Sequence, residues 1–96
     1  MRFIAFEPTP NPNAIKCVIE PDEAHAASGI RSYFTADAAG AEPDPLAHAL
    51  FAIPGVANLL IHSAFITVGK SPEAKWPAIK PRVKAVIGEH REPTDA

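Results

Sequence analysis

The stretch Thr9–Lys16, TPNPNAIK, decides how the fold of this chain begins. Pro10 and Pro12 push the residues before them towards extended geometry. The two asparagines favour turns, because their side chains bond to nearby backbone groups. The segment therefore predicts a stiff turn that leads into a strand.

Strands are predicted on both sides of this turn. Ile15, Cys17 and Ile19 alternate with more polar residues, which is typical of a half-buried strand over 14–20. Upstream, the apolar run 3–7 ends before a proline and also predicts a strand. The side chains of Ile15, Cys17 and Ile19 are expected to share one buried face.

The rest of the chain divides at its prolines and glycines. Asp44 is a good N-cap and Pro45 suits the first helical position, so a helix is expected to begin there. Apolar residues at helical spacing predict a second helix. The expected elements are a loop over 22–30, a strand over 31–35, a connection over 36–42, a helix over 44–53, strands over 56–62 and 65–70 joined by a tight turn, and a helix over 76–90.

This order, β-β-β-α-β-β-α, predicts an α+β fold. Two helices cover only one face of such a sheet, so we expect a two-layer sandwich with a mostly antiparallel sheet. Residues 1–91 are expected to form a single domain, and residues 92–96 a flexible C-terminal tail.

Composition narrows the classes of function. The chain has 96 residues, 47% of them hydrophobic, and a net charge of −2, which favours neither nucleic acid nor an anionic membrane as a partner. A single cysteine forms no internal disulfide and fits a reducing compartment, so we expect a cytoplasmic protein. The apolar run at Met1–Phe6 is too short for a signal peptide.

Candidate reactive groups are few. Cys17 alternates in phase with Ile15 and Ile19, which favours a buried, inert thiol over a nucleophile or metal ligand. The histidines lack metal-ligand spacing and are interpreted as incidental surface residues. They are His25, His48, His62 and His90. The sequence thus nominates no catalytic, cofactor-binding or metal-binding residue, and we expect no enzyme.

The sequence supports a role in binding a partner better than a role in catalysis. The Pro-Asn segment either stiffens a connection or displays a rigid loop to a partner, and the structural role is favoured. The sheet face opposite Cys17 is expected to display Tyr33, Leu60 or Phe65, which would make a contact surface if they form one patch. Asn11, Asn13 and Phe65 are therefore the candidate partner-binding residues.

Several stretches together resemble the N-terminal domain of Nfu-type iron–sulfur scaffold proteins. They occur in the family's order and cover residues 3 to about 90, and no single piece is decisive. The matching pieces are residues 7–16 (EPTPNPNAIK), 45–56 (PLAHALFAIPGV) and 65–70 (FITVGK), followed by Trp76 and the pair Lys80-Pro81.

The resemblance implies a non-catalytic accessory module. It would assist iron–sulfur cluster assembly or delivery through contacts with assembly factors or client apoproteins. Full-length Nfu proteins carry a second domain with a Cys-x-x-Cys pair that holds the cluster, and this chain is expected to stand alone without it. Iron or a cluster is therefore suggested by resemblance only, because cluster ligation needs several thiolates.

Two departures from the family pattern bear on single residues. Family members often have an aromatic residue where Cys17 stands, which supports Cys17 as a core residue, and an acid where Ala64 stands. The alternative function is a small iron- or other metal-binding protein that uses histidines and carboxylates brought together by the fold.

Overall fold

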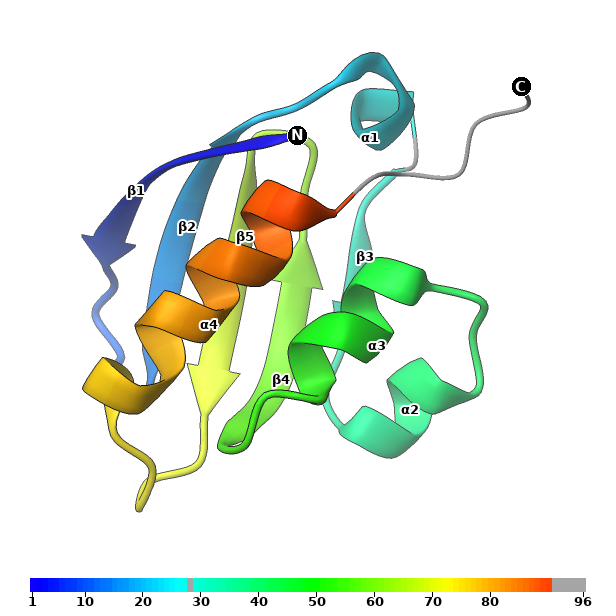
Figure 1. The fold of residues 1–96 in the computed structure, drawn as a ribbon. Helices are drawn as coiled ribbons and strands as arrows, with labels where there is room; N and C mark the ends of the chain where they lie inside the picture. The colour runs from blue at the N-terminus through cyan, green and yellow to red at the C-terminus, as the bar shows by residue number, and fades with distance from the viewer. Residues whose placement is uncertain (28, 91–96) are drawn as a thin grey trace.

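An antiparallel sheet forms one layer of the molecule in the computed structural model, which describes residues 1–27 and 29–90 (Figure 1). Five strands make up this sheet in the described residues, in the spatial order β1-β2-β5-β4-β3. Every neighbouring pair is antiparallel. The strands are β1 (Arg2–Pro8), β2 (Ala14–Glu20), β3 (Arg31–Tyr33), β4 (Val56–Ile61) and β5 (Phe65–Lys70).

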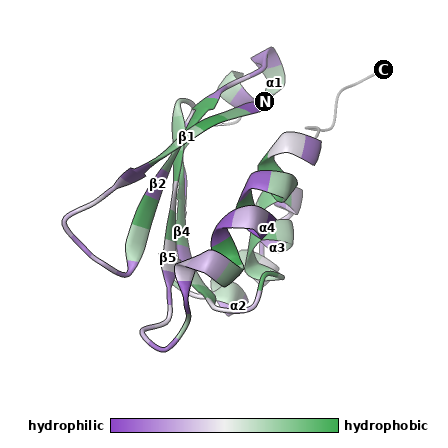
Figure 2. Ribbon diagram, turned by 60° about the vertical axis from the view of Figure 1, so that its left-hand side comes forward, coloured by the Kyte–Doolittle hydropathy of each residue, from purple (hydrophilic) through white to green (hydrophobic). Residues whose placement is uncertain are grey.

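Helices form the second layer. In Figure 2, α2 (Ala36–Gly40), α3 (Pro45–Phe51) and α4 (Trp76–Glu89) lie on the same side of the sheet. The short α1 (Glu23–Ala27) lies at one end of the sheet. The predicted α+β class, antiparallel sheet and helix-covered face are confirmed. Among the described residues, no helix has the length and apolar character needed to cross a lipid bilayer.

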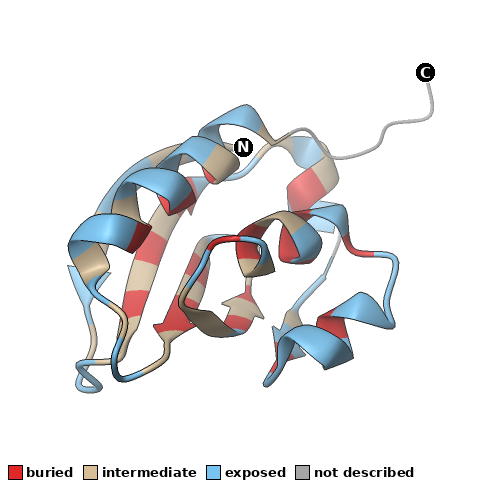
Figure 3. Cartoon of the chain, turned by 60° about the horizontal axis from the view of Figure 1, so that its bottom comes forward, coloured by how far each residue is buried: buried red, intermediate tan, exposed pale blue. Residues whose placement is uncertain are grey.

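The core lies between these two layers. Buried positions alternate along the strands and recur on the helices (Figure 3). The predicted inward face of β2 is confirmed, since Ile15, Cys17 and Ile19 are all buried. The helices contribute Leu46, Ala47, Leu50, Ile79, Val83 and Ile87, and the other strands contribute Tyr33, Leu59, Ile61, Ile66 and Val68.

Two short helices were not predicted. Residues 22–30, expected to be a loop, include α1, and residues 36–42, expected to be a connection, include α2. Asp22 accepts a hydrogen bond from the His25 N–H at 2.8 Å, and Thr35 accepts one from the Ala38 N–H at 3.1 Å. These side chains satisfy N–H groups that a helix start leaves unpaired. Because Thr35 caps α2, β3 ends at Tyr33 and not at residue 35.

The two principal helices begin as expected. Asp44 accepts a hydrogen bond from the Ala47 N–H and caps α3, with Pro45 at its first position. The helix α4 continues through Pro81, which is exposed and lies early in the helix. Its end at Glu89 lies one residue before the predicted end. The predicted tail, residues 92–96, lies outside the described residues, and the domain boundary at residue 91 stays a prediction.

Gly55 makes the turn between α3 and β4. Its φ of +96° lies in the left-handed region that favours glycine, and an added Cβ would lie 2.8 Å from the Cβ of Ala74. The helix α3 ends at Phe51, two residues before the predicted end at residue 53, and the turn at Gly55 then leads the chain into β4.

Candidate partner-binding surface

The sheet side away from α2, α3 and α4 is hereafter the uncovered face, since none of these helices packs on it (Figure 2). Val18 pairs with Phe65, and Leu60 pairs with Thr67, so residues of three neighbouring strands share this face. Val18, Leu60 and Phe65 are each half-buried. They place an apolar patch beside polar groups, which is the composition of a protein contact surface.

Phe65 lies within this patch between two polar side chains. The His62 ring stacks on it, with centroids 4.6 Å apart and planes inclined by 8°. The Lys16 ammonium lies 4.7 Å from the ring centroid, within the range of a cation–π contact. His62 Nδ1 accepts the Ala64 N–H at 3.1 Å, so in this arrangement the proton of a neutral His62 ring is on Nε2. Phe65 therefore contacts both a ring and a cation on this face.

Tyr33 does not lie on the uncovered face, so its expected place there was wrong. It pairs with the buried Leu59, and its hydroxyl donates to Asp44 at 2.8 Å. The next residue, Phe34, is 84% exposed. The buried Asp44 therefore holds Tyr33 on the inward side, while Phe34 lies at the surface.

Hydrogen bonds of Asn11 and Asn13 stabilise the loop between β1 and β2. The Asn11 side-chain oxygen accepts the Asn13 N–H at 2.9 Å, which closes an Asx turn. The Asn13 side-chain oxygen accepts from Lys70 Nζ at 2.9 Å. The Pro12 carbonyl accepts from the Trp76 indole N–H at 3.0 Å. The structural role that was favoured for this segment therefore has specific contacts, which tie the loop to the end of β5 and the start of α4.

The three candidate partner-binding residues do not form one site. Asn13 contacts Lys70 at the C-terminal end of β5, whereas Phe65 begins that strand. Five residue steps along a strand separate the two ends by about 17 Å. Asn11 and Asn13 belong to a loop at one end of the sheet, and Phe65 belongs to the uncovered face at the other.

Cys17 is buried, with no exposed surface. Burial raises the pKa of its thiol to about 12, although the nearby charge of Lys80 acts in the opposite direction. A nucleophilic or metal-ligating cysteine needs an accessible thiolate. The interpretation of Cys17 as a core residue is confirmed.

His25 was wrongly interpreted as a surface residue. Its side chain is fully buried, and Nε2 donates to the carbonyl of His62 at 3.0 Å. The short helix α1 turns this ring towards the β4–β5 hairpin. His48 is exposed, as predicted, and its ring nitrogen lies 2.9 Å from the Ala39 carbonyl.

The alternative of a metal-binding protein finds no site within residues 1–27 and 29–90. These residues include no group of three or more histidine, cysteine, aspartate or glutamate side chains arranged to hold a metal ion. The fold brings the His25 ring to the backbone carbonyl of His62, whereas the ring of His48 contacts the Ala39 carbonyl of α2. Iron binding by clustered histidines and carboxylates is therefore unsupported there.

Asp44 accepts several hydrogen bonds besides the capping one, a role that was not predicted. Arg31 donates to it through Nε at 2.8 Å and through a terminal nitrogen at 3.3 Å, in addition to the bond from Tyr33. Burial by itself raises the pKa of this carboxyl, but the hydrogen bonds from Arg31, Tyr33 and Ala47 outweigh it and hold the pKa below its usual value. Arg31 and Tyr33 join β3 to the start of α3, and Ala47 completes the cap of that helix, so the network serves the fold.

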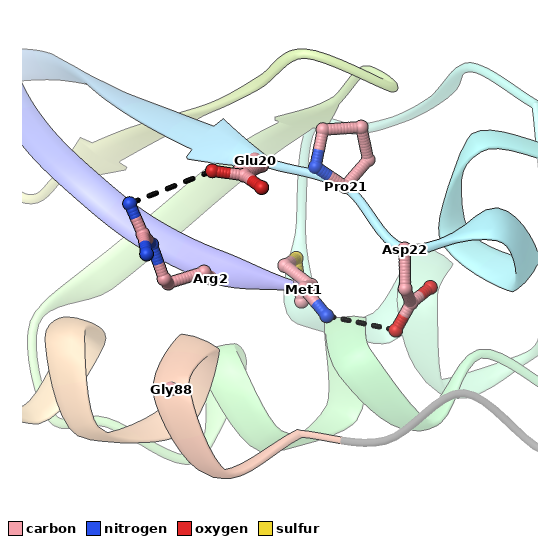
Figure 4. A pocket seen from close by; sticks show the side chains of 6 residues that line it. All are labelled: Met1, Arg2, Glu20, Pro21, Asp22 and Gly88. Atoms are coloured by element: carbon pink, nitrogen blue, oxygen red, sulfur yellow. Dashed lines mark hydrogen bonds and ion pairs between the residues drawn. The ribbon is translucent and has the colours of Figure 1, made fainter.

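A shallow hollow of about 580 Å³ lies beside the N-terminus (Figure 4). The Met1 ammonium and the His25 N–H bond to Asp22 and lower the pKa of that carboxyl. Arg2 Nη2 lies 3.5 Å from a Glu20 oxygen. The charges around the hollow therefore compensate one another. The lining residues are Met1, Arg2, Glu20, Pro21, Asp22 and Gly88.

Solved structures share this arrangement of sheet and helices. The crystal structure of Staphylococcus aureus protein SAV1430 matches with a TM-score of 0.71 at 27% identity, over 91% of this chain and 99% of that one. The solution structure of a NifU-like protein from Saccharomyces cerevisiae matches with a TM-score of 0.68 at 26% identity, over 91% of this chain and 77% of that one.

Curated sequences are similar over most of the chain. The NFU1 iron–sulfur cluster scaffold homolog, mitochondrial, of Drosophila willistoni is 39% identical over 85 residues, which are 88% of this chain and 28% of that protein. NifU-like protein 5, mitochondrial, of Arabidopsis thaliana is 34% identical over 85 residues, which are 88% of this chain and 30% of that protein. The chain thus spans less than a third of the length of these two relatives.

A family model supplies the assignment. The model described as scaffold protein Nfu/NifU N terminal matches residues 4–94, which include the turn at Thr9–Lys16 and most of the described elements. The resemblance seen in the sequence is confirmed. This chain belongs to the family of Nfu/NifU scaffold protein N-terminal domains.

Proposed function

We propose that this chain is a non-catalytic module that assists iron–sulfur cluster assembly or delivery by binding another protein through its uncovered face. The supporting observation is the patch of Val18, Leu60 and Phe65 on a sheet side that α2, α3 and α4 leave open in a member of this scaffold family. The proposed partners are assembly factors or client apoproteins.

Residue chemistry also favours binding over catalysis. The only thiol is buried with a raised pKa, and the Asp44 carboxyl is enclosed by its own structural donors. A catalytic nucleophile or base must reach the substrate. Relatives are named as scaffold proteins, which agrees with this part of the proposal.

The cellular location proposed for this module is the cytoplasm, because its single cysteine suits a reducing compartment. The Drosophila willistoni and Arabidopsis thaliana relatives are named as mitochondrial. Fractionation of cells that express the tagged chain at its natural level tests this part: recovery in a membrane-bounded organelle would contradict it.

Affinity capture with matched variants tests the binding role. Val18→Lys and Leu60→Lys place charges on the uncovered face, whereas Ala85→Lys places one on an exposed position of α4. Iron–sulfur assembly factors or client apoproteins should be captured by the wild-type chain and by Ala85→Lys, and lost with the two face variants. Equal capture by all four chains, or capture of no such protein by the wild type, would overturn the proposal. Circular dichroism confirms that each variant is folded.

A further inference from the structure

Among the residues that the structure describes, the strand β1 lies at one edge of the sheet and pairs with β2 alone. Its seven residues leave one row of backbone N–H and C=O groups without a neighbouring strand among the described residues. Such an edge is a template for pairing with another strand. The hydrophobic side chain of Ile4 on this strand is 45% exposed.

An irregularity in β1 changes which side chains share a face. Arg2 pairs with Glu20 and Glu7 pairs with Lys16, with a register shift between Phe3 and Ala5. Glu20 and Lys16 are four residues apart on β2, so they point to the same side of the sheet. Arg2 and Glu7 are five residues apart and would point to opposite sides in a regular strand, but the bulge places both on the uncovered face.

The resulting pattern along β1 is self-complementary in the antiparallel sense. The uncovered face shows a positive charge at Arg2, small or apolar residues at Ile4 and Ala5, and a negative charge at Glu7. An identical strand running in the opposite direction sets Arg2 against Glu7 at both ends. A parallel copy would instead set like charges against each other, which is unfavourable.

We propose that β1 pairs in an antiparallel manner with β1 of a second copy of this chain, around a two-fold axis between Ile4 and Ala5. Each Arg2 then lies opposite the other copy's Glu7, and each Ile4 lies opposite the other copy's Ala5. On the helix side, Phe3 of each copy lies opposite the other's Phe6, and the two sheets become continuous. A two-fold contact of this kind closes on itself and does not propagate.

The bulge, which usually protects an edge from pairing, is compatible with this contact. Both copies carry one extra residue at the same place, so the strands oppose each other residue for residue. The ion pairs within one copy leave the charges of Arg2 and Glu7 available for contacts between copies. Arg2–Glu20 and Lys16–Glu7 span 3.5 and 3.8 Å, and the Arg2 and Glu7 side chains are 75% and 55% exposed. Exposed pairs of this length contribute little to stability.

Sedimentation analysis of charge variants tests the proposal, with any purification tag placed at the C-terminus. The wild-type chain should show a reversible monomer–dimer equilibrium as its concentration is raised to the level used for protein NMR. Arg2→Glu and Glu7→Arg should each weaken dimerisation about tenfold or more, because two attractive pairs become repulsive. An equimolar mixture of the two variants should restore a dimer, since every cross-strand pair is then attractive.

Control variants separate the new contact from the ion pairs within one copy. Glu20→Arg places like charges beside Arg2, and Lys16→Glu places them beside Glu7, without altering the proposed contact. Both controls should dimerise as the wild type does. A wild-type chain that stays monomeric, or a dimer that Arg2→Glu and Glu7→Arg leave intact, would overturn the proposal. The test needs no iron–sulfur partner, so its result is independent of the proposed function.

Discussion

The indole N–H of Trp76 donates to the carbonyl of Pro12 at 3.0 Å, across 64 positions of sequence. This bond joins the start of α4 to the turn that precedes β2. Lys70 reinforces the junction, since its backbone N–H and its ammonium both donate to Asn13. The stretch Thr9–Lys16 therefore fixes the position of α4 as well as the entry into the sheet.

Replacing Trp76 with phenylalanine tests this junction. Trp76→Phe keeps an aromatic ring and removes the N–H donor, so unfolding free energy should fall by about 0.5–1.5 kcal/mol. Urea denaturation followed by circular dichroism measures the change. The neighbouring Lys75, which makes no side-chain cap at α4, provides the control. Lys75→Ala should stay within about 0.5 kcal/mol of the wild type, and an equal loss in both variants would contradict the account.

The Asp44 network predicts loss of stability in acid. Because folding lowers the pKa of Asp44, the unfolded chain binds its proton more readily. The stabilisation should be complete above the ordinary aspartate pKa of about 3.9 and should decline as pH falls through the lowered value. Denaturant midpoints measured between neutral pH and acid report this decline.

Asp44→Asn provides the matching variant. It should lower the unfolding free energy at neutral pH by about 2–4 kcal/mol, because Arg31 loses its carboxylate partner. It should also flatten the acid dependence, since the titrating group is gone. A variant that shows the full wild-type acid dependence would mean that other carboxyls carry it.

Cys17 should be inert in the native protein. Its thiol is buried, and a pKa of about 12 leaves almost no thiolate at neutral pH. A chromogenic disulfide reagent should label one thiol per chain in urea and should label the native chain only as slowly as it unfolds. Rapid labelling of native protein would contradict the core assignment and reopen a chemical role for Cys17.

A side chain at Gly55 should destabilise the fold. Gly55→Ala combines a φ of +96° with an approach of 2.8 Å to the Ala74 Cβ, so it should cost about 1–3 kcal/mol. Gly40 is the control, because a Cβ there meets nothing within 4 Å and its φ is not in the left-handed region. Thermal denaturation should show a lowered midpoint for Gly55→Ala and little change or a slight rise for Gly40→Ala.

Periodicity predicted the parts of the fold that bury apolar side chains in a regular pattern. Ile15, Cys17 and Ile19 repeat every second residue, and Ile79, Val83 and Ile87 repeat every fourth, so β2 and α4 were both predictable. The helix α1 was not, because the side chain that it buries is His25, which carries no hydrophobic signal. For α2 a signal did exist: Thr35 is a favourable N-cap residue.

The candidate surface was harder to predict than the fold. Phe65 was placed on a sheet face by alternation, but its contacts with His62 and Lys16 depend on strand register and on the hairpin turn. Tyr33 was assigned to the wrong face because β3 is too short for the alternation of apolar and polar residues to show which side is buried. Arg2 and Glu7 lie on the same face only because of the bulge in β1, and no local sequence pattern predicts that bulge.

Binding through the uncovered face is tested by titrating isotope-labelled chain with a purified iron–sulfur assembly factor or client apoprotein and following the amide chemical shifts. A partner bound there should perturb the amide shifts of Val18, Leu60 and Thr67 on the uncovered face and leave those along the exposed side of α4 unchanged. Shifts confined to α4, or no change with any such protein at concentrations well above those used for capture, would contradict it.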